Sequence, residues 1–257
     1  MSEKDPYDEI AECYDYLLPE DSEAYIESIF QMIQERYPNL KDAILADIGG
    51  GTGRLTFQIY DRIGKIILVD PSKKILNIAK SKFNSKIHTN IEFRQAGFPN
   101  CGLEKNSIDI IAVINAFGFS QSVEEQLLAL KDIYQSLKRG GLLFIDNNNF
   151  YALIRDFKSP QIIEREIENQ KITIIGQHEI FPHKQLWVHT YTIFLENIKT
   201  GEIKKKFSKF EGRMMSSTEM FLLLKEAGFI DIEITTPPQV DEKESASTWF
   251  FVRKPNI

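Results

Sequence analysis

The residues most able to do chemistry lie around a glycine-rich loop near residue 50. The segment AILADIGGGTGRL, residues 43–55, places four glycines in five positions directly after an apolar run. Glycine has no Cβ, so its backbone can approach a ligand closely and adopt conformations that other residues avoid. Loops of this composition bind several kinds of nucleotide cofactor, so the residues around the loop must decide between them.

Arg54 argues against two of these kinds. A loop that binds nucleoside triphosphates carries Lys and then Ser or Thr after its last glycine, whereas Gly53 is followed by Arg54 and Leu55. The dinucleotide fingerprint G-x-G-x-x-G has a third glycine that lets the helix pack closely on the strand. Counted from Gly51, that third position is again Arg54, whose side chain would obstruct the packing.

The pattern that fits is Asp-x-Gly-x-Gly-x-Gly, formed by Asp47, Gly49, Gly51 and Gly53. It resembles motif I of the class I S-adenosylmethionine-dependent methyltransferases. The resemblance continues in Asp70, at the end of the next expected strand, and in the segments NSIDIIAVINAF, LKRGGLLFID and STWFFVRKP. It is nearest to small-molecule enzymes such as the glycine and sarcosine N-methyltransferases. The resemblance implies S-adenosylmethionine as the cofactor and methyl transfer as the reaction.

The resemblance also gives a role to the two carboxylates. Asp47 is expected to accept a charge-assisted hydrogen bond from the ammonium group of the cofactor. Asp70 is expected to accept both ribose hydroxyls, as an acidic residue does in dinucleotide enzymes. The structural alternatives are a solvated strand end for Asp47 and a carboxylate beside a helix start for Asp70. Besides the loop glycines, the other cofactor-binding residues that the resemblance implies are Pro71, Gly97, Phe98 and Asn115.

Two positions depart from the pattern of the family. Related enzymes commonly carry an acidic residue after the third strand that accepts the adenine amino hydrogen, and the matching residue here is Gly97. The backbone N–H of Phe98 can still donate to the adenine ring, while its side chain either packs on adenine or joins the core. Gly50 stands where many relatives have a larger residue.

The methyl acceptor is harder to read from the sequence. Methyl transfer depends on alignment of the reacting groups, and a general base is needed only where the nucleophile must lose a proton. The resemblance makes Tyr14, in YDEIAECYDYL, and Asn149, in IDNNNF, candidate catalytic residues. Arg213 is a third candidate, because a guanidinium can bind an acceptor carboxylate. Their structural alternatives are helix packing, an ordinary asparagine loop and a surface ion pair.

The spacing of the histidines and cysteines does not predict a metal site. His178, His183 and His189 are close in sequence, but no carboxylate or cysteine completes a recognisable ligand spacing. One of them could act as a base or bind the acceptor, although plain strand positions are the favoured interpretation. Cys13 and Cys101 have no CxxC spacing, so neither a zinc site nor a disulfide framework is expected.

The elements that position these residues alternate between strand and helix through the first 150 residues. This order predicts right-handed βαβ units and a parallel sheet with helices on both faces. Ser72 is an expected N-cap, and capping boxes are expected at Ser122 and Ser216. The segment KRGG, residues 138–141, is expected to end a helix. The first long helix is expected in residues 22–37, and the first five strands in residues 43–48, 65–69, 91–95, 108–114 and 142–145.

The periodicity changes after Asn149. Residues 171–210 have an apolar period nearer two than 3.6, which predicts an antiparallel meander inserted before the last helix. The expected fold is therefore α/β: a doubly wound, mostly parallel seven-stranded Rossmann-like methyltransferase sheet with an inserted antiparallel β-meander cap. We expect a helical cap segment in residues 1–40, the cofactor-binding core in 41–155 and 214–257, and a substrate or lid subdomain in 156–213.

The composition of the chain limits the classes of partner that we expect it to bind. The 257 residues are 42% hydrophobic and 26% charged, with a formal net charge of -6. No long basic run argues for nucleic acid, no apolar stretch nears the roughly 20 residues of a membrane span, and the N-terminus lacks a secretory signal. We expect a cytoplasmic protein, monomer or homodimer, that methylates a small-molecule acceptor. The alternatives are an RNA (tRNA) methyltransferase and a non-catalytic binding protein of the same fold.

Overall fold

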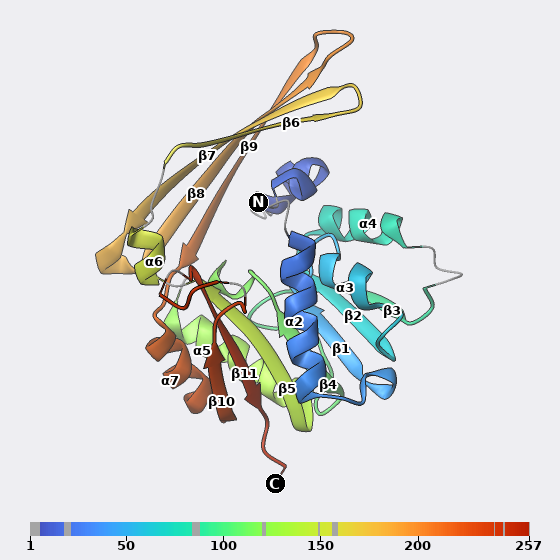
Figure 1. The fold of residues 1–257 in the computed structure, drawn as a ribbon, viewed down its shortest axis with the longest axis vertical. Helices are drawn as coiled ribbons and strands as arrows, with labels where there is room; N and C mark the ends of the chain where they lie inside the picture. Colours follow the sequence, from blue (N-terminus) through green and yellow to red (C-terminus); the bar gives the residue numbers. More distant parts are fainter. Residues whose placement is uncertain are drawn as a thin grey trace.

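A computed structural model describes most of the chain as two sheets with helices packed around the larger one (Figure 1). The larger sheet has seven strands in the order β10-β11-β5-β4-β1-β2-β3, and the smaller has four in the order β6-β7-β8-β9. The described residues are 6–17, 22–83, 88–119, 122–148, 150–155, 159–238, 240–243 and 245–256.

The seven-stranded sheet is mostly parallel, as the strand and helix alternation predicts. Strands β3, β2, β1, β4 and β5 run parallel to their neighbours, whereas β11 is antiparallel to both β5 and β10. The expected doubly wound, Rossmann-like α/β fold is thereby confirmed. Its strands are β1 (Ile44–Ile48), β2 (Lys65–Asp70), β3 (Ile91–Gln95), β4 (Ile108–Val113), β5 (Leu137–Asn148), β10 (Ile230–Thr235) and β11 (Ser247–Arg253).

Helices cover both faces of this sheet, because alternate residues of its central strands point to opposite sides. On one face, Ile111 and Val113 of β4 share a core with α5 and α7, while on the other Ile110 and Ala112 pack with α2 and α3. Strand β4 is therefore buried on both faces, which explains its continuous apolar run. The longer helices are α2 (Ser22–Arg36), α3 (Arg54–Ile59), α4 (Lys73–Lys82), α5 (Val123–Ser136), α6 (Phe150–Arg155) and α7 (Ser217–Ala227).

The three predicted helix starts are confirmed, but the predicted end of α5 at residues 138–141 is wrong. The side chains of Ser72, Ser122 and Ser216 each accept a hydrogen bond from a backbone N–H of the first turn. The segment KRGG does not end α5, which stops at Ser136. These glycines belong to β5, since Gly140 donates to the carbonyl of Lys254, and Lys254 to that of Gly141. Pairing with the C-terminal segment decides the conformation, and such a distant contact cannot be seen in the local sequence.

The four-stranded antiparallel sheet follows β5 and α6 in the chain, and stands beside the larger sheet in Figure 1. Three of its strands contain the segments that alternate in the sequence, whereas the edge strand β6 was not predicted. Its central residues, Glu164 to Glu166, are charged and interrupt the alternation, as is common on edge strands. The strands are β6 (Gln161–Ile167), β7 (Gln170–Phe181), β8 (Leu186–Asn197) and β9 (Ile203–Arg213). The division into domains at residues 156 and 213 stays a prediction.

The N-terminal segment fills the space between the two sheets. It consists of α1 (Pro6–Ile10) and the 3-10 helix η1 (Ala11–Leu17), drawn in dark blue in Figure 1. Ile10 and Cys13 share an apolar cluster with Ile174 and Phe210 of the four-stranded sheet. Other short 3-10 helices are η2 (Leu40–Asp42), η3 (Phe117–Phe119) and η4 (Pro182–Lys184).

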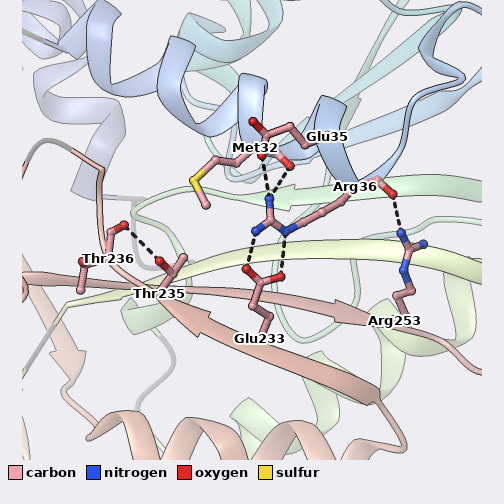
Figure 2. Close-up of polar contacts among 7 residues, drawn as sticks. All are labelled: Met32, Glu35, Arg36, Glu233, Thr235, Thr236 and Arg253. Carbon is pink, nitrogen blue, oxygen red and sulfur yellow. Dashed lines mark hydrogen bonds and ion pairs between the residues drawn. The ribbon is translucent and has the colours of Figure 1, made fainter.

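Helix α2 is fixed to the antiparallel edge of the large sheet by the arginine at its end (Figure 2). The Arg36 guanidinium donates to both carboxylate oxygens of Glu233 on β10, and to the carbonyl of Met32 at 2.9 Å. It also lies 4.1 Å from the ring centroid of Phe251 on β11. The carbonyl of Arg36 in turn accepts a hydrogen bond from Arg253. These contacts hold α2 against β10 and β11.

A buried polar chain gives a first test of how α2 supports the sheet. Tyr25 donates to Asp146 Oδ2 at 3.0 Å and accepts from the indole N–H of Trp249 at 3.0 Å. Tyr25→Phe should lower the free energy of unfolding by about 1–3 kcal/mol, because it leaves that buried N–H without an acceptor. Urea unfolding of the two proteins measures the difference.

The matched control is Tyr37→Phe. Tyr37 donates to Asp109 Oδ1 at 3.1 Å, but Asp109 also accepts from Ile44 and Lys138, so less should be lost. An equal or larger loss in Tyr37→Phe than in Tyr25→Phe would contradict this account of α2.

Candidate cofactor-binding site

A cavity of about 380 Å³ lies where β1, β2 and β4 end. Ligands of open α/β sheets bind at this edge, where neighbouring connections leave the sheet on opposite sides. Here β1 has β2 on one side and β4 on the other. The cavity is lined by Tyr7, Tyr14, Ile48, Gly49, Gly51, Asp70, Pro71, Ile75, Gly97, Phe98, Pro99, Asn115, Ala116 and Glu125.

The glycine loop forms one wall, and its shape requires glycine. Gly49, Gly51 and Gly53 have φ of 69°, 59° and 85°, in the left-handed region that other residues rarely adopt. A Cβ on Gly49 would lie 2.3 Å from the Cβ of Ala116, and one on Gly51 would lie 3.3 Å from the Tyr14 ring. Gly49 and Gly51 line the cavity, whereas Gly53 is the N-cap of α3. The backbone can therefore approach a ligand closely at this wall.

Asp70 stands at the end of β2 and faces the cavity. Its Oδ2 accepts the backbone N–H of Gly51 at 3.0 Å, and its Oδ1 accepts that of Ser72 at 2.9 Å. A carboxylate has about four acceptor positions, and these two bonds orient the group at the edge of the cavity. Asp70 thus combines the helix-start position of the alternative interpretation with a place in the cavity.

Asp47 is not a solvated strand end, because only 2% of it is exposed. Its Oδ2 accepts the hydroxyl of Thr56 at 2.8 Å. Burial raises the pKa of the Asp47 carboxyl to about 6. The side chain lines a small cavity of about 30 Å³ that shares Tyr14, Gly49 and Asn115 with the main one.

Because Gly50 has no side chain, the Asp47 carboxylate can lie directly beside it. A Cβ at residue 50 would lie 2.9 Å from Asp47 Oδ2 and 2.9 Å from Leu68 Cγ. The absence of a side chain here is the second departure from the family pattern, and it has a local consequence. It lets the carboxylate occupy the position in which Thr56 binds it.

The other expected cofactor-binding residues also line the cavity. A Cβ on Gly97 would lie 3.1 Å from Pro71 Cβ, so the loop after β3 packs tightly on the loop after β2. Phe98 lies edge-on to Phe117, with ring centroids 5.5 Å apart, and thereby touches the core as well as the cavity. Asn115 has a φ of 52°, and its N–H donates to Asp146 Oδ1 at 2.7 Å. Their contacts with the cofactor stay predictions.

The three candidate catalytic residues are placed differently. Tyr14 lines the cavity and covers Gly51, and burial raises the pKa of its hydroxyl. Arg213 lies outside the residues that line the cavity. Its guanidinium donates to Gln126 at 2.9 Å and forms an ion pair with Glu219, which is largely buried and not the surface ion pair given above as the alternative. Asn149 lies outside the described residues.

His178 and His189 occupy strand positions in β7 and β8 beside an aromatic cluster, whereas His183 lies in η4 between these strands, so the expected strand position is wrong for His183. The rings of His178 and His189 have centroids 3.7 Å apart, and Trp187 donates to His178 Nδ1 at 3.1 Å. Burial lowers the pKa of His189 to about 3, so this imidazole is neutral near pH 7. In the part of the chain that the structure describes, no group of His, Cys, Asp and Glu could hold a metal ion.

Tyr7 and Glu125 line the cavity but were not identified from the sequence. Tyr7 reaches it because its ring packs on Phe210 of β9, at 4.5 Å between centroids. Glu125 reaches it from the first turn of α5. The capping-box spacing of Ser122 and Glu125 predicts a helix start, but no local pattern shows that this start borders the cavity.

The environment of Asp47 yields a stability prediction. Because the folded pKa of about 6 exceeds the ordinary value of about 3.9, the stability that this group contributes falls as the pH rises between these values. Asp47→Asn removes the ionisation, so its stability relative to the wild type should rise between pH 4 and pH 6, then stay constant. Thermal unfolding from pH 4 to pH 8 measures this difference.

Asp61→Asn is the control, since Asp61 is exposed and should show no such trend. A fall in the stability of Asp47→Asn relative to the wild type between pH 4 and pH 6 would contradict the prediction.

Comparisons with known proteins agree with this geometry. Residues 45–141 match a family described as "Methyltransferase domain". The ubiquinone/menaquinone biosynthesis C-methyltransferase UbiE of Campylobacter jejuni is 34% identical over 136 residues, which cover 48% of the chain and 54% of that relative. The chain thus matches about half the length of this curated relative.

Solved structures share the fold over nearly the whole chain. An S-adenosylmethionine-dependent methyltransferase from Clostridium acetobutylicum superposes with a TM-score of 0.79 at 17% identity, covering 98% of this chain and 100% of that one. The S-adenosylmethionine-bound amino pentose methyltransferase CalS10 of Micromonospora echinaspora has a TM-score of 0.69 at 14% identity, covering 89% of each chain. These comparisons show that residues 45–141 match a methyltransferase domain and that the chain shares the Rossmann-like fold of S-adenosylmethionine-dependent methyltransferases.

Proposed function

We propose that the protein transfers the methyl group of S-adenosylmethionine to a small-molecule acceptor with a nitrogen or oxygen nucleophile. When bound, the cofactor supplies a sulfonium methyl group that the nucleophile displaces in line. The observation that carries the proposal is the pair of tyrosine rings that the N-terminal segment contributes to the cavity. Tyr7 and Tyr14 line the cavity, and Tyr7 packs in turn on Phe210 of the four-stranded sheet. A cavity lined in this way by aromatic and apolar side chains with a few polar groups suits a small metabolite.

The residues present fit the cofactor. Gly49 and Gly51 line the cavity without a Cβ, so their backbone can lie against the ribose and the methionyl chain. Asp70 faces the cavity with an oriented carboxylate, which suits two ribose hydroxyls. Asp47 adjoins the cavity, and its charge suits an ammonium group.

The chain contributes mainly alignment and exclusion of water. Tyr14 covers the loop next to the expected methionyl end, and Asn115 is held in a left-handed conformation by Asp146 on the other side. Both are rigid neighbours of the reacting centre, which favours a fixed approach of the nucleophile. The role of Asn149 stays a prediction from the sequence. No general base is assigned, because nitrogen nucleophiles can react in their neutral form.

The charges around the cavity favour a small molecule over RNA, the alternative acceptor. Its lining contains the carboxylates Asp70 and Glu125, and none of the described lining residues is lysine or arginine. A site for RNA would be expected to present cations to the phosphates. The relative from Campylobacter is named as a C-methyltransferase of quinone biosynthesis, which adds carbon nucleophiles to the small molecules worth testing. None of the helices in the described part of the chain is long and apolar enough to span a membrane.

The test combines calorimetry with methyl transfer. S-adenosylmethionine and S-adenosylhomocysteine should both bind, and radiolabelled methyl groups should pass to a low-molecular-weight fraction of metabolites. Absence of binding at millimolar cofactor would contradict the proposal. Label transferred to tRNA alone would support the RNA alternative, and binding without transfer to any fraction would support a non-catalytic binding protein.

The ribose contact has its own prediction. Asp70→Ala should weaken the binding of S-adenosylhomocysteine by about 1.5–3 kcal/mol, the range for hydrogen bonds to a charged group. Asp61→Ala, at an exposed aspartate outside the cavity, is the control and should bind as the wild type does. Unchanged affinity in Asp70→Ala, with both variants folded by circular dichroism, would show that the ribose assignment is wrong.

A further inference from the structure

The four-stranded sheet has two faces with different surroundings. Successive side chains of a strand point to opposite faces, so the strand register assigns each residue to one of them. On the inner face, Ile174 and Phe210 share an apolar cluster with Ile10 of the N-terminal segment. Ser208, on the same face, donates to the carbonyl of Pro6 at 2.7 Å. The inner face is therefore covered by the N-terminal segment of the chain itself.

The outer face of the sheet carries apolar side chains that the described residues leave exposed. Ile162 on β6 is 64% exposed, and Phe207 on β9 is 56% exposed. Ile175 and Thr192 lie between them in the same row across the sheet. Neighbours in such a row lie about 5 Å apart, so the four side chains form one strip. A contiguous exposed strip of this kind marks an interaction surface, whereas single exposed apolar residues do not.

The next row of the outer face has opposite charges at its two ends. It consists of Glu164, Thr173, Phe194 and Lys205, in order from β6 to β9. Three strand spacings of about 4.8 Å separate the Glu164 carboxylate from the Lys205 ammonium, so the two cannot pair within one chain. Glu164 contacts Lys171 at 3.3 Å, but its side chain remains 58% exposed. Lys205 is exposed, and no ion pair joins it to the residues that the structure describes.

A two-fold axis parallel to the strands makes the outer face complementary to itself. An axis midway between β7 and β8 sets β6 of one copy opposite β9 of the other and keeps each row opposite itself. Ile162 then faces the partner's Phe207, and Glu164 faces the partner's Lys205. An axis across the strands would set β6 opposite β6 and lose both pairings. Sheets that pack face to face keep their strands within about 30° of each other, which suits the first arrangement.

The size of the outer face is sufficient for a stable contact. Strands β7 and β8 have 12 residues each and β9 has 11. At about 3.4 Å per residue and about 4.8 Å between strands, the face is about 40 Å long and about 15–20 Å wide. Its area is close to the roughly 800 Å² that each partner buries in a standard interface.

The charges of the outer face favour a second copy over other partners. The face has carboxylates at Glu166 and Glu196 as well as ammonium groups at Lys171 and Lys209. Nucleic acids and anionic membranes attract surfaces on which positive charge predominates. A face with both signs of charge is matched by a partner that also has both signs, and a second copy of the chain supplies them.

We propose that the protein forms a two-fold symmetric dimer through the outer faces of its four-stranded sheets, with Ile162 against the partner's Phe207 and Glu164 paired with the partner's Lys205. The inference goes beyond the proposed function, because it assigns a surface that methyl transfer does not use. The inner face of the same sheet supports Tyr7 at the cavity through Phe210. The dimer therefore stabilises, in both copies, the sheet that lies behind this wall of the cavity.

Sedimentation equilibrium of the full chain tests the proposal. The wild type should be a dimer that dissociates on dilution. Phe207→Glu places a carboxylate in the apolar row and should raise the dissociation constant of the dimer by about tenfold or more, as expected for a residue central to an interface. The matched control is Leu128→Glu, because Leu128 on α5 is also 56% exposed and lies outside the sheet. This control should dimerise as the wild type does, and circular dichroism checks that both variants fold.

An exchange of charges tests the two-fold arrangement itself. Glu164→Lys and Lys205→Glu should each weaken the dimer, because each brings two pairs of like charges together across the axis. Combined in one protein, the two substitutions should return the dissociation constant to within about threefold of the wild type, since their effects are coupled.

The outcomes that would overturn the proposal are distinct. A monomeric wild type, or a dimer that Phe207→Glu leaves intact, would overturn it. Failure of the combined variant to recover would show that Glu164 and Lys205 do not meet across a two-fold axis, and would overturn it as well. A monomeric wild type that sediments with phosphatidylglycerol vesicles, and loses this property in Phe207→Glu, would assign the face to a membrane surface instead.

Discussion

The hydrogen bond from the backbone N–H of Gly51 to Asp70 Oδ2 joins the turn after β1 to the end of β2. It forms only because the loop is left-handed at Gly49, Gly51 and Gly53, which points backbone groups toward the neighbouring strand. Glycine also lets this loop pack closely on its neighbour, since a Cβ on Gly49 would lie 2.3 Å from the Cβ of Ala116. Loop conformation, carboxylate orientation and cavity shape therefore depend on one constraint.

A second set of contacts places the opposite wall. Asp146, at the end of β5, accepts from Asn115 on one side and from Tyr25 of α2 on the other. Tyr25 also accepts from Trp249, so the residue that holds Asn115 is connected to α2 and β11. The N-terminal segment then closes the cavity with Tyr7 and Tyr14, which the four-stranded sheet supports from behind. The inserted sheet thus contributes to the site by holding aromatic rings over it.

Local chemistry made much of this predictable. The spacing of Asp47, Gly49, Gly51 and Gly53 depends on backbone conformation within seven residues, and the helix caps depend on one side chain and one turn. The pattern of the sequence therefore predicted the loop that forms one wall of the cavity, the alternation of strands and helices in the first half, and the place of Asp70 at the end of a strand. The conformation of the segment KRGG was not predictable in this way, because the C-terminal segment pairs with it from more than a hundred residues away.

The acceptor side shows the same limit more strongly. Arg213 had the right chemistry for a carboxylate, but its neighbours Gln126 and Glu219 come from α5 and from α7, and their proximity follows only from the packing of those helices. Tyr7 and Glu125 enter the cavity through tertiary contacts as well. Arg54 was noted in the sequence only for what it excludes, while the structure shows it beside two buried carboxylates.

The central claim is that Asp70 and Asp47 hold the two ends of S-adenosylmethionine against the glycine loop. A crystal structure of the full chain with S-adenosylhomocysteine tests it most directly. The account predicts both ribose hydroxyls within hydrogen-bond distance of the Asp70 carboxylate and the ammonium group beside Asp47. A ligand bound instead in the separate cavity of about 680 Å³ that Arg54, Lys82 and Arg165 line would contradict it. A ligand whose ribose lies away from Asp70 would contradict it as well.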